Sequence, residues 1–335
     1  MKASLIAKII LGICILCLFT AFFTVDKYKA YEYDGERTKS SIKTNTNKVA
    51  VIELEGIIAT TYESNFFSKE KNATNLLKSL ITLQSDNEIK GAIIKLNTPG
   101  GTVATSQSIY NQIKKLRETK PVIVVFDDIS ASGGYYIASA ADRIIAQEGS
   151  LTGSIGVIFS FMDYHSLLTN KLSINPIIIK SGKFKDIGSG ARAMSQEEKQ
   201  LMQNIVNDSY SQFIDAITNG RIKREDNYTA EKSILTEKNL KKYADGRIFT
   251  GRQAQKLGFV DTLGDMDTAK STIEKMVQEK FNNKLPVKLI EYSKKSLFSD
   301  YFSTLTEYKS KVNFNIEEFI PTSMILSKRP LYLWE

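Results

Sequence analysis

Residues 122–141, VIVVFDDISASGGYYIASAA, determine the fold class. They open with an apolar run, Val122 to Phe126, in which Val and Ile follow one another without alternating polar residues. Such runs are typical of strands that are buried on both faces, as in a parallel sheet. A turn marked by Gly133 and Gly134 follows, and the alanine-rich residues near 133–141 favour a helix. The stretch therefore predicts the strand, turn and helix of an α/β fold.

The same order recurs along the chain. We expect further strands and helices at these positions: strands at 49–54, 91–96, 174–179 and 247–250, and helices near 72–84, 104–118 and 266–279. The clearest helix is 196–219, because Ser195 and Glu198 form a capping box before it and Gly220 can end it. This order predicts a mostly parallel sheet with right-handed crossovers.

Composition excludes several kinds of site. The 335 residues carry 45 basic and 37 acidic side chains, but no basic stripe interleaved with aromatics that would indicate nucleic-acid binding. The only cysteines are Cys14 and Cys17, and the only histidine is His165. A disulfide framework and a thiolate metal site are therefore not expected beyond the N-terminus. We expect no metal and no other cofactor.

The N-terminus predicts a membrane anchor. Residues 9–25 are uncharged and almost wholly apolar, which is just long enough to span a bilayer. We expect 1–8 to be a short cytoplasmic tail, 9–25 an uncleaved signal anchor and 26–47 a polar tether. The remaining chain would then lie on the extracytoplasmic side of the cell membrane, either in a periplasm or at the cell exterior. A cleaved signal peptide and a lipid-bearing Cys17 are the alternatives, but neither has a fitting cleavage site.

Three glycine-marked turns follow predicted strands, at 97–101, 130–136 and 181–189. Because open parallel sheets gather their sites at the carboxyl ends of strands, the three turns can converge at one edge. Ser132 lies between a strand and a helix, where free N–H groups and the helix dipole favour developing negative charge. It is a candidate nucleophile, although a simple helix N-cap is an equal reading of this position alone.

A serine nucleophile needs a base. His165 is a weak candidate because it lies at the start of an apparent surface helix. Lysine is the other standard base, and a lysine in that role needs a pKa lowered from about 10.4 towards about 7–8. The turn at 181–189 supplies Lys183 and Lys185. A lysine base predicts activity at alkaline pH.

Five stretches in order resemble the signal peptide peptidase (SppA, protease IV) family, a relative of the Clp proteases and crotonases. They are NTPGG at 97–101, ASGGYY at 131–136, LTGSIGV at 151–157, SGKFKDIGS at 181–189 and ADGRIFTGR at 244–252. The resemblance implies repeated ββα units in a peptidase domain at 48–280, followed by a C-terminal extension at 281–335 of unassigned role.

The resemblance also implies roles for particular residues. Ser132 matches the nucleophile and Lys185 the general base, while the amides of Gly100 and Gly133 would form the oxyanion hole and Ser154 would orient the lysine. Two letters depart from the family pattern: Thr98 replaces a common Ser and Phe184 a common Tyr. Lys183 would point to the same side as Lys185 and is a second possible base.

The resemblance implies an endopeptidase that degrades cleaved signal peptides and other hydrophobic peptides, and that assembles into a ring or dome of identical chains. Family members sometimes pair serine and lysine across neighbouring subunits, but the short single-domain form here implies both residues in each chain. The alternatives are a non-catalytic membrane scaffold with the same fold and a crotonase-like acyl-CoA enzyme. The extracytoplasmic location expected here speaks against the latter because CoA is intracellular. The apolar, aromatic residues 330–335 are expected to dock on the fold.

Overall fold

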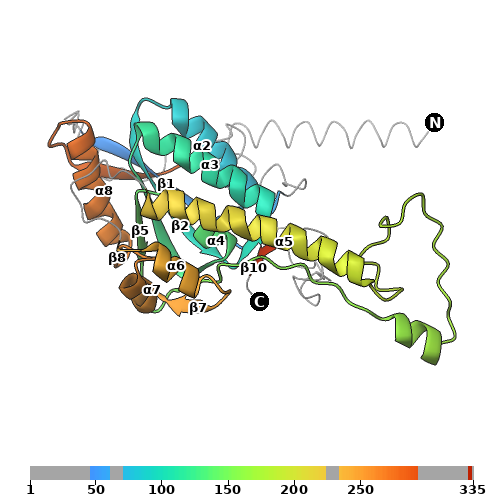
Figure 1. The fold of residues 1–335 in the computed structure, drawn as a ribbon. Helices are drawn as coiled ribbons and strands as arrows, with labels where there is room; N and C mark the ends of the chain where they lie inside the picture. The colour runs from blue at the N-terminus through green and yellow to red at the C-terminus, as the bar shows by residue number, and fades with distance from the viewer. Residues whose placement is uncertain (1–45, 61–70, 224–233, 293–330, 334–335) are drawn as a thin grey trace, which may run out of the picture. The chain divides into compact units, whose positions relative to one another are not determined.

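The computed structural model describes residues 46–60, 71–223, 234–292 and 331–333 (Figure 1). The predicted anchor at 9–25 and nearly all of the tether lie outside these residues. No helix within the described ranges is both long and apolar enough to cross a membrane. The chain divides into two compact units, Met1–Thr44 and Asn45–Glu335, and the second contains the features below.

Within the described residues, eight strands form one α/β sheet. Its main path runs β7-β6-β4-β2-β1-β9, and β5 joins β4 to β8. All pairs are parallel except β6 with β7. The strands are β1 (Asn47–Glu55), β2 (Ile89–Thr98), β4 (Val122–Ala131), β5 (Arg143–Ala146), β6 (Leu151–Gly153), β7 (Ile248–Thr250), β8 (Thr262–Leu263) and β9 (Val287–Glu291).

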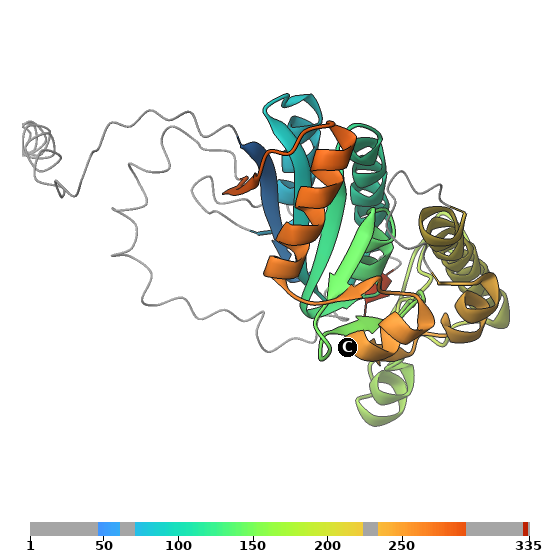
Figure 2. The same ribbon diagram turned by 90° about the vertical axis from the view of Figure 1, so that its left-hand side faces the viewer.

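Helices cover both faces of this sheet, which explains the continuous apolar strands. Ile93 of β2 packs with Ile273 and Val277 of α8 (Met266–Lys280) in one core cluster. Its neighbour Ile94 lies in the opposite cluster with α2 (Ala73–Ser85) and α3 (Val103–Thr119). Figure 2 shows α8, in orange, against one face of the sheet. The predicted buried strands at 49–54, 91–96 and 122–126 are confirmed, and so are the helices near 72–84, 104–118 and 266–279.

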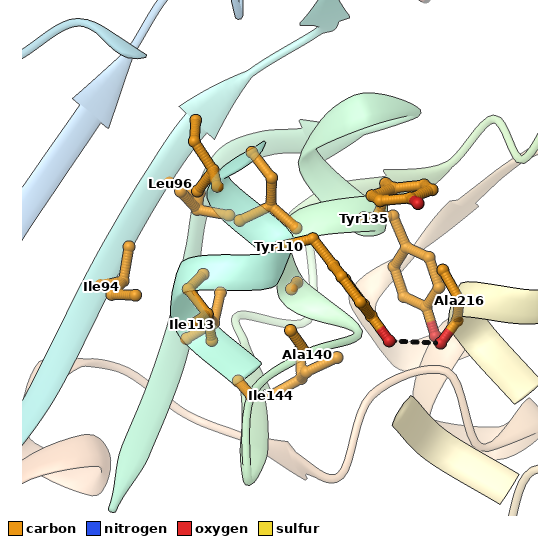
Figure 3. Close-up of a cluster of buried hydrophobic side chains, with 14 of the residues drawn as sticks. Ile94, Leu96, Tyr110, Ile113, Tyr135, Ala140, Ile144 and Ala216 are labelled. Atoms are coloured by element: carbon orange, nitrogen blue, oxygen red, sulfur yellow. Dashed lines mark hydrogen bonds between the residues drawn. The ribbon is translucent and has the colours of Figure 1, made fainter. Parts of the chain in front are cut away.

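The larger core cluster joins the sheet to α4 (Gly133–Ala138) and α5 (Gln196–Ile217). Figure 3 shows Tyr110 of α3 reaching from this cluster to the end of α5, where its hydroxyl donates to the Ala216 carbonyl at 3.1 Å. Tyr136 of α4 lies edge-on to Tyr110 at 5.2 Å between ring centroids and packs against Phe213 of α5. The position of α4 is thus fixed from two neighbouring helices.

The N-terminus of α5 is as predicted, but its C-terminus is not. Ser195 and Glu198 form both bonds of the capping box. Gly220 does not end the helix, because a π-helical turn (Thr218–Ile222) continues through it. A Cβ at this position would lie 2.1 Å from the Ser139 carbonyl oxygen. The glycine is needed for close backbone approach to α4, not as a stop.

The predicted strand at 174–179 is wrong. These residues form no strand, and Ile177 and Ile179 are 88% and 96% exposed. They belong to the segment between β6 and α5, which extends beyond the sheet in green to yellow-green (Figure 1). Apolar content indicated burial here, but nothing among the described residues covers this segment. We call residues 156–195 the arm.

Two further short helices and two further short strands occur in the described chain. A short helix, α6 (Glu237–Tyr243), precedes β7, and α7 (Gly251–Leu257) follows it with a second capping box. The short strand β3 (Gly100–Thr102) pairs antiparallel with β10 (Leu331–Leu333). Residues 331–333 therefore dock on the fold, as expected for 330–335, whose other residues lie outside the described ranges.

Candidate active site

Ser132 occupies the junction between β4 and α4. It stands at the N-cap position of α4 and has φ 51° and ψ −114°, a positive-φ conformation that residues other than glycine rarely adopt. Its amide donates to the Gly153 carbonyl at 2.9 Å, and its own carbonyl accepts the first helical bond, from Tyr136. Backbone strain of this kind is concentrated at functional sites.

The Ser132 hydroxyl is fully buried, and its Oγ has no hydrogen-bond partner among the described residues. Buried polar atoms are nearly always paired, because an unpaired one costs about 1–3 kcal/mol. The N-cap reading requires Oγ to accept an amide of the first helical turn, but no such bond is present. The Ser132 side chain therefore does not cap α4, although the residue occupies the N-cap position.

The glycine turn at 97–101 lies directly beside Ser132. Thr98 pairs with Ser130 across β2 and β4. Its Oγ1 accepts the amide of Gly100 at 3.1 Å. A Cβ on Gly134 would lie only 2.7 Å from the Thr98 methyl carbon. The structure thus brings into contact two of the three predicted turns, which contain the amides of Gly100 and Gly133.

These two amides are the expected oxyanion donors. Gly133 is the first residue of α4, so its N–H has no intrahelical acceptor. The Gly100 amide is already bonded to Thr98 Oγ1, and its φ of 113° requires glycine. The Thr98 bond was not predictable from the sequence, because it depends on how the turn closes.

Strand β3 is paired on both sides at this junction. On one side, Ile58 bridges to Gly101, with its amide 2.8 Å from the Gly100 carbonyl. On the other side, β10 lies antiparallel, with Tyr332 opposite Gly101. The backbone of β3 therefore already carries an extended segment of this chain along one side.

Ser154 lies one residue beyond the Gly153 carbonyl that holds the Ser132 amide. It is 6% exposed, has φ 49°, and donates its amide to the Arg247 carbonyl at 2.7 Å. Ser132 and Ser154 thus follow the adjacent ends of β4 and β6, where Ala131 pairs with Gly153.

Lys185 is not brought to Ser132 within this chain. It is exposed, and it lies in a turn of the arm in which its amide donates to the Gly182 carbonyl. The expectation that all three turns converge is therefore met by two of them. The third does not converge because no strand forms at 174–179 to carry it to the sheet edge.

His165 also lies in the arm, where its Nδ1 is 2.9 Å from the Ala191 carbonyl oxygen. No group of three or more potential metal ligands occurs in the described part of the chain. The tyrosines after the glycine pair anchor α4. Tyr135 donates to the Phe259 carbonyl at 3.0 Å, and burial raises the pKa of Tyr136 to about 12.

Comparison with known proteins gives the family of this chain. The family model of Peptidase family S49 matches residues 114–280, and that of Clp protease matches residues 46–148. The chain is 34% identical over 251 residues to a candidate signal peptide peptidase SppA of Enterococcus faecium, covering 74% of this chain and 69% of that protein. It is 40% identical over 229 residues to a candidate protease of Synechocystis, covering 68% and 74%. The chain belongs to peptidase family S49.

A member of family S49 is a serine peptidase, and the fold is the Clp-protease-like α/β fold with a mostly parallel sheet. A longer S49 relative is the chloroplastic serine protease SPPA of Arabidopsis thaliana. It is 32% identical over 225 residues, which cover 67% of this chain and 31% of that protein. Among solved structures, a mutant of the membrane-bound stomatin-specific protease 1510-N aligns with a TM-score of 0.44 and 16% identity. That alignment covers 74% of this chain and 99% of that one.

Proposed function

We propose that this S49 peptidase is a membrane-anchored endopeptidase that degrades cleaved signal peptides and other hydrophobic peptides, with Ser132 as nucleophile and Lys185 as base. The observation that carries the proposal is the state of Ser132. Its hydroxyl is buried and unpaired among the described residues, on a strained backbone at the start of α4. A nucleophile that waits for its base has these properties.

In the proposed reaction, Ser132 Oγ attacks the scissile carbonyl while Lys185 Nζ takes its proton. The lysine then returns that proton to the leaving amine, and water releases the acyl group in a second round. The amides of Gly100 and Gly133 stabilise the tetrahedral oxyanion. The Gly100 amide exchanges Thr98 Oγ1 for this oxygen, and the Ser154 hydroxyl orients the lysine.

We further propose that Lys185 reaches Ser132 of a neighbouring copy. Lys185 is exposed on the arm, and Ser132 has no partner among the described residues of its own chain. The arm also exposes Ile177, Ile179 and Met162, and exposed apolar surface of this kind marks an interaction site. A homo-oligomeric ring or dome would cover it and complete every site. This arrangement replaces the expectation that both residues act within one chain.

The proposed substrate pairs as a strand with β3 in place of β10. The β10 pairing supports this, since an extended segment already lies along that edge. Main-chain hydrogen bonds would supply affinity with little dependence on sequence. The anchor proposed at 9–25 would hold the domain beside the extracytoplasmic face of the membrane, where signal peptides are released.

The test uses full-length chains purified in detergent. Ser132→Ala and Lys185→Ala are assayed alone and after mixing, dissociation and reassembly, with Lys183→Ala as the control. Each variant alone should be inactive, and Lys183→Ala should be active. The mixture should regain about a quarter of wild-type activity, since half of the serines and half of the neighbouring lysines are intact.

Three results would contradict parts of this proposal. Full activity of Ser132→Ala would remove the nucleophile. An inactive mixture would place serine and lysine in the same chain. Hydrolysis that is equally fast for polar peptides and signal-peptide segments would remove the substrate class. The location is tested separately, because a protease added outside intact cells or spheroplasts should digest the domain.

A further inference from the structure

We infer that Arg192 is a positioning residue of this peptidase, which fixes the loop that carries Lys185 to the N-terminus of α5. The inference rests on the proposed role of Lys185 as the base. Arg192 lies seven positions after Lys185 and three before the cap residue Ser195. It joins the arm to α5 through two carboxylates that are largely shielded from water.

Arg192 binds a carboxylate on each side. Its Nε and Nη2 donate to Asp186 Oδ2 and Oδ1 at 2.8 and 2.7 Å. Its Nη1 donates to Glu198 Oε2 at 2.8 Å, and Nη2 also contacts Glu198 Oε1. Lys180 adds a bond to Asp186 Oδ1 at 2.5 Å. We call Lys180, Asp186, Arg192 and Glu198 the Arg192 clamp.

The clamp encloses the base loop at both ends. Lys180 precedes the loop, and Asp186 directly follows Lys185, so the Lys180–Asp186 pair closes it. The Asp186 and Glu198 side chains are only 8% and 3% exposed. Glu198 is also the capping-box glutamate, since its Oε2 accepts the Ser195 amide at 2.8 Å. The loop is therefore tied to the first turn of a 22-residue helix.

A second ion pair joins the same loop to the same helix turn and provides a comparison. Lys183 pairs with Glu197, but these side chains are 67% and 58% exposed. Exposed pairs of this kind contribute little, because water and salt screen the attraction. The bidentate geometry and shielding of the Arg192 clamp make it the stronger connection.

The Arg192 clamp stays charged in the alkaline pH range in which a lysine base is active. Hydrogen bonds from Arg192 lower the pKa of Glu198 to about 2 and hold the pKa of Asp186 well below its usual range. Both carboxylates are therefore ionised at neutral and alkaline pH. Without the guanidinium, the two would repel each other and release the loop. Misplacing a catalytic group by about 1 Å can cost about 100-fold in rate.

The experiment uses four variants of the full-length chain. Glu198→Gln and Glu197→Gln make the same change at adjacent positions, and Arg192→Ala and Arg192→Lys change the guanidinium. Steady-state hydrolysis of a fluorogenic hydrophobic peptide gives kcat and KM. Hydrogen exchange of the amides at 182–189 reports loop order without reference to activity.

We expect Arg192→Ala to lower kcat roughly 10- to 100-fold with KM nearly unchanged, and to speed exchange at 182–189 but not in the sheet. Arg192→Lys should recover only part of kcat, since one ammonium cannot bridge two carboxylates bidentately. Glu198→Gln should lower kcat and speed exchange in the same direction, and Glu197→Gln should match wild type. If Arg192→Ala does not fold, Glu198→Gln provides the test.

Wild-type kcat in Arg192→Ala or Glu198→Gln, beside an inactive Lys185→Ala, would overturn the positioning role alone. So would faster exchange at 182–189 without any loss of kcat. An active Lys185→Ala would instead overturn the proposed base, and the positioning role with it.

Discussion

At the scale of single residues, Ser132 combines a strained backbone with an unpaired hydroxyl. Its φ of 51° suits glycine better than any residue with a Cβ. Such strain costs about 1–3 kcal/mol and persists only where the surroundings enforce it. The fold holds Ser132 in this conformation through its amide bond to the Gly153 carbonyl and the start of α4.

We therefore expect Ser132→Gly to be more stable than Ser132→Ala, by about 1 kcal/mol, although both are inactive. Ser108 provides the control because it is exposed in the middle of α3. There the order should reverse, with Ser108→Gly about 1 kcal/mol less stable than Ser108→Ala. Urea unfolding of the four variants measures both differences. The same order at both positions would show that Ser132 is not strained.

Gly134 tests the contact between the two glycine turns. A methyl group there would lie 2.7 Å from the Thr98 methyl carbon, and Thr98 is fully buried. Gly134→Ala should therefore displace the turn that carries the Gly100 amide and lower kcat/KM by at least tenfold, about 1.4 kcal/mol. Gly149→Ala is the control, since nothing lies within 4 Å of its added methyl. Equal activity of the two variants would refute this contact as a constraint on the site.

At the scale of elements, the junction of α5 with the arm predicts an acid-sensitive connection. Asp186 and Glu198 have pKa values below their usual 3.8 and 4.5. Their contribution to stability is therefore complete above about pH 4.5, and that of Glu198 is lost as the pH falls towards about 2. The difference in melting temperature between wild type and Glu198→Gln should be constant from neutral pH down to about pH 5 and shrink below it.

Glu197→Gln serves as the control in the same melting experiment, because its ion pair is exposed. A difference between wild type and Glu198→Gln that persists unchanged at pH 3 would mean that the Glu198 carboxylate gains nothing from Arg192. A difference already absent at pH 7 would have the same meaning.

The strands and turns differ in how well the sequence alone predicts them. The strand 122–126 and the turn at Ser132 were predictable, because an unbroken apolar run and adjacent glycines are local signals. The run 174–179 carries the same apolar signal but lies exposed in the arm, since local composition does not say what will cover it. Arg192 could not be identified either, because its two carboxylates meet only after the loop folds onto α5.

At the scale of the whole molecule, the placement of Lys185 predicts that activity depends on assembly. If each site takes its lysine from a neighbour, dilution below the assembly concentration should abolish hydrolysis, and concentration should restore it. Initial rates at fixed detergent concentration, compared with sedimentation of the same samples, measure this. Constant specific activity in samples that sediment as single chains would exclude the shared site.

The whole molecule also limits what sequence could predict about the site. Both glycine turns follow adjacent parallel strands, so their convergence follows from topology alone. In the proposed oligomer, the position of Lys185 relative to Ser132 depends on the contact between two copies of the chain. The sequence resemblance named both residues, but the short single-domain form implied that they act within one chain, whereas Lys185 lies exposed on the arm.

The sheet is complete only after strand β9 has been synthesised. This strand pairs with β1 at the edge of the sheet, and Asn47 reaches Asn283 across 236 positions, with 2.8 Å between their side-chain atoms. During translation, β1 emerges first but keeps one edge open until residues 287–291 leave the ribosome. Nascent chains on one messenger would present identical open edges to each other, and such edges readily pair. A premature stop codon before Val287 should therefore yield aggregates and not a shorter enzyme.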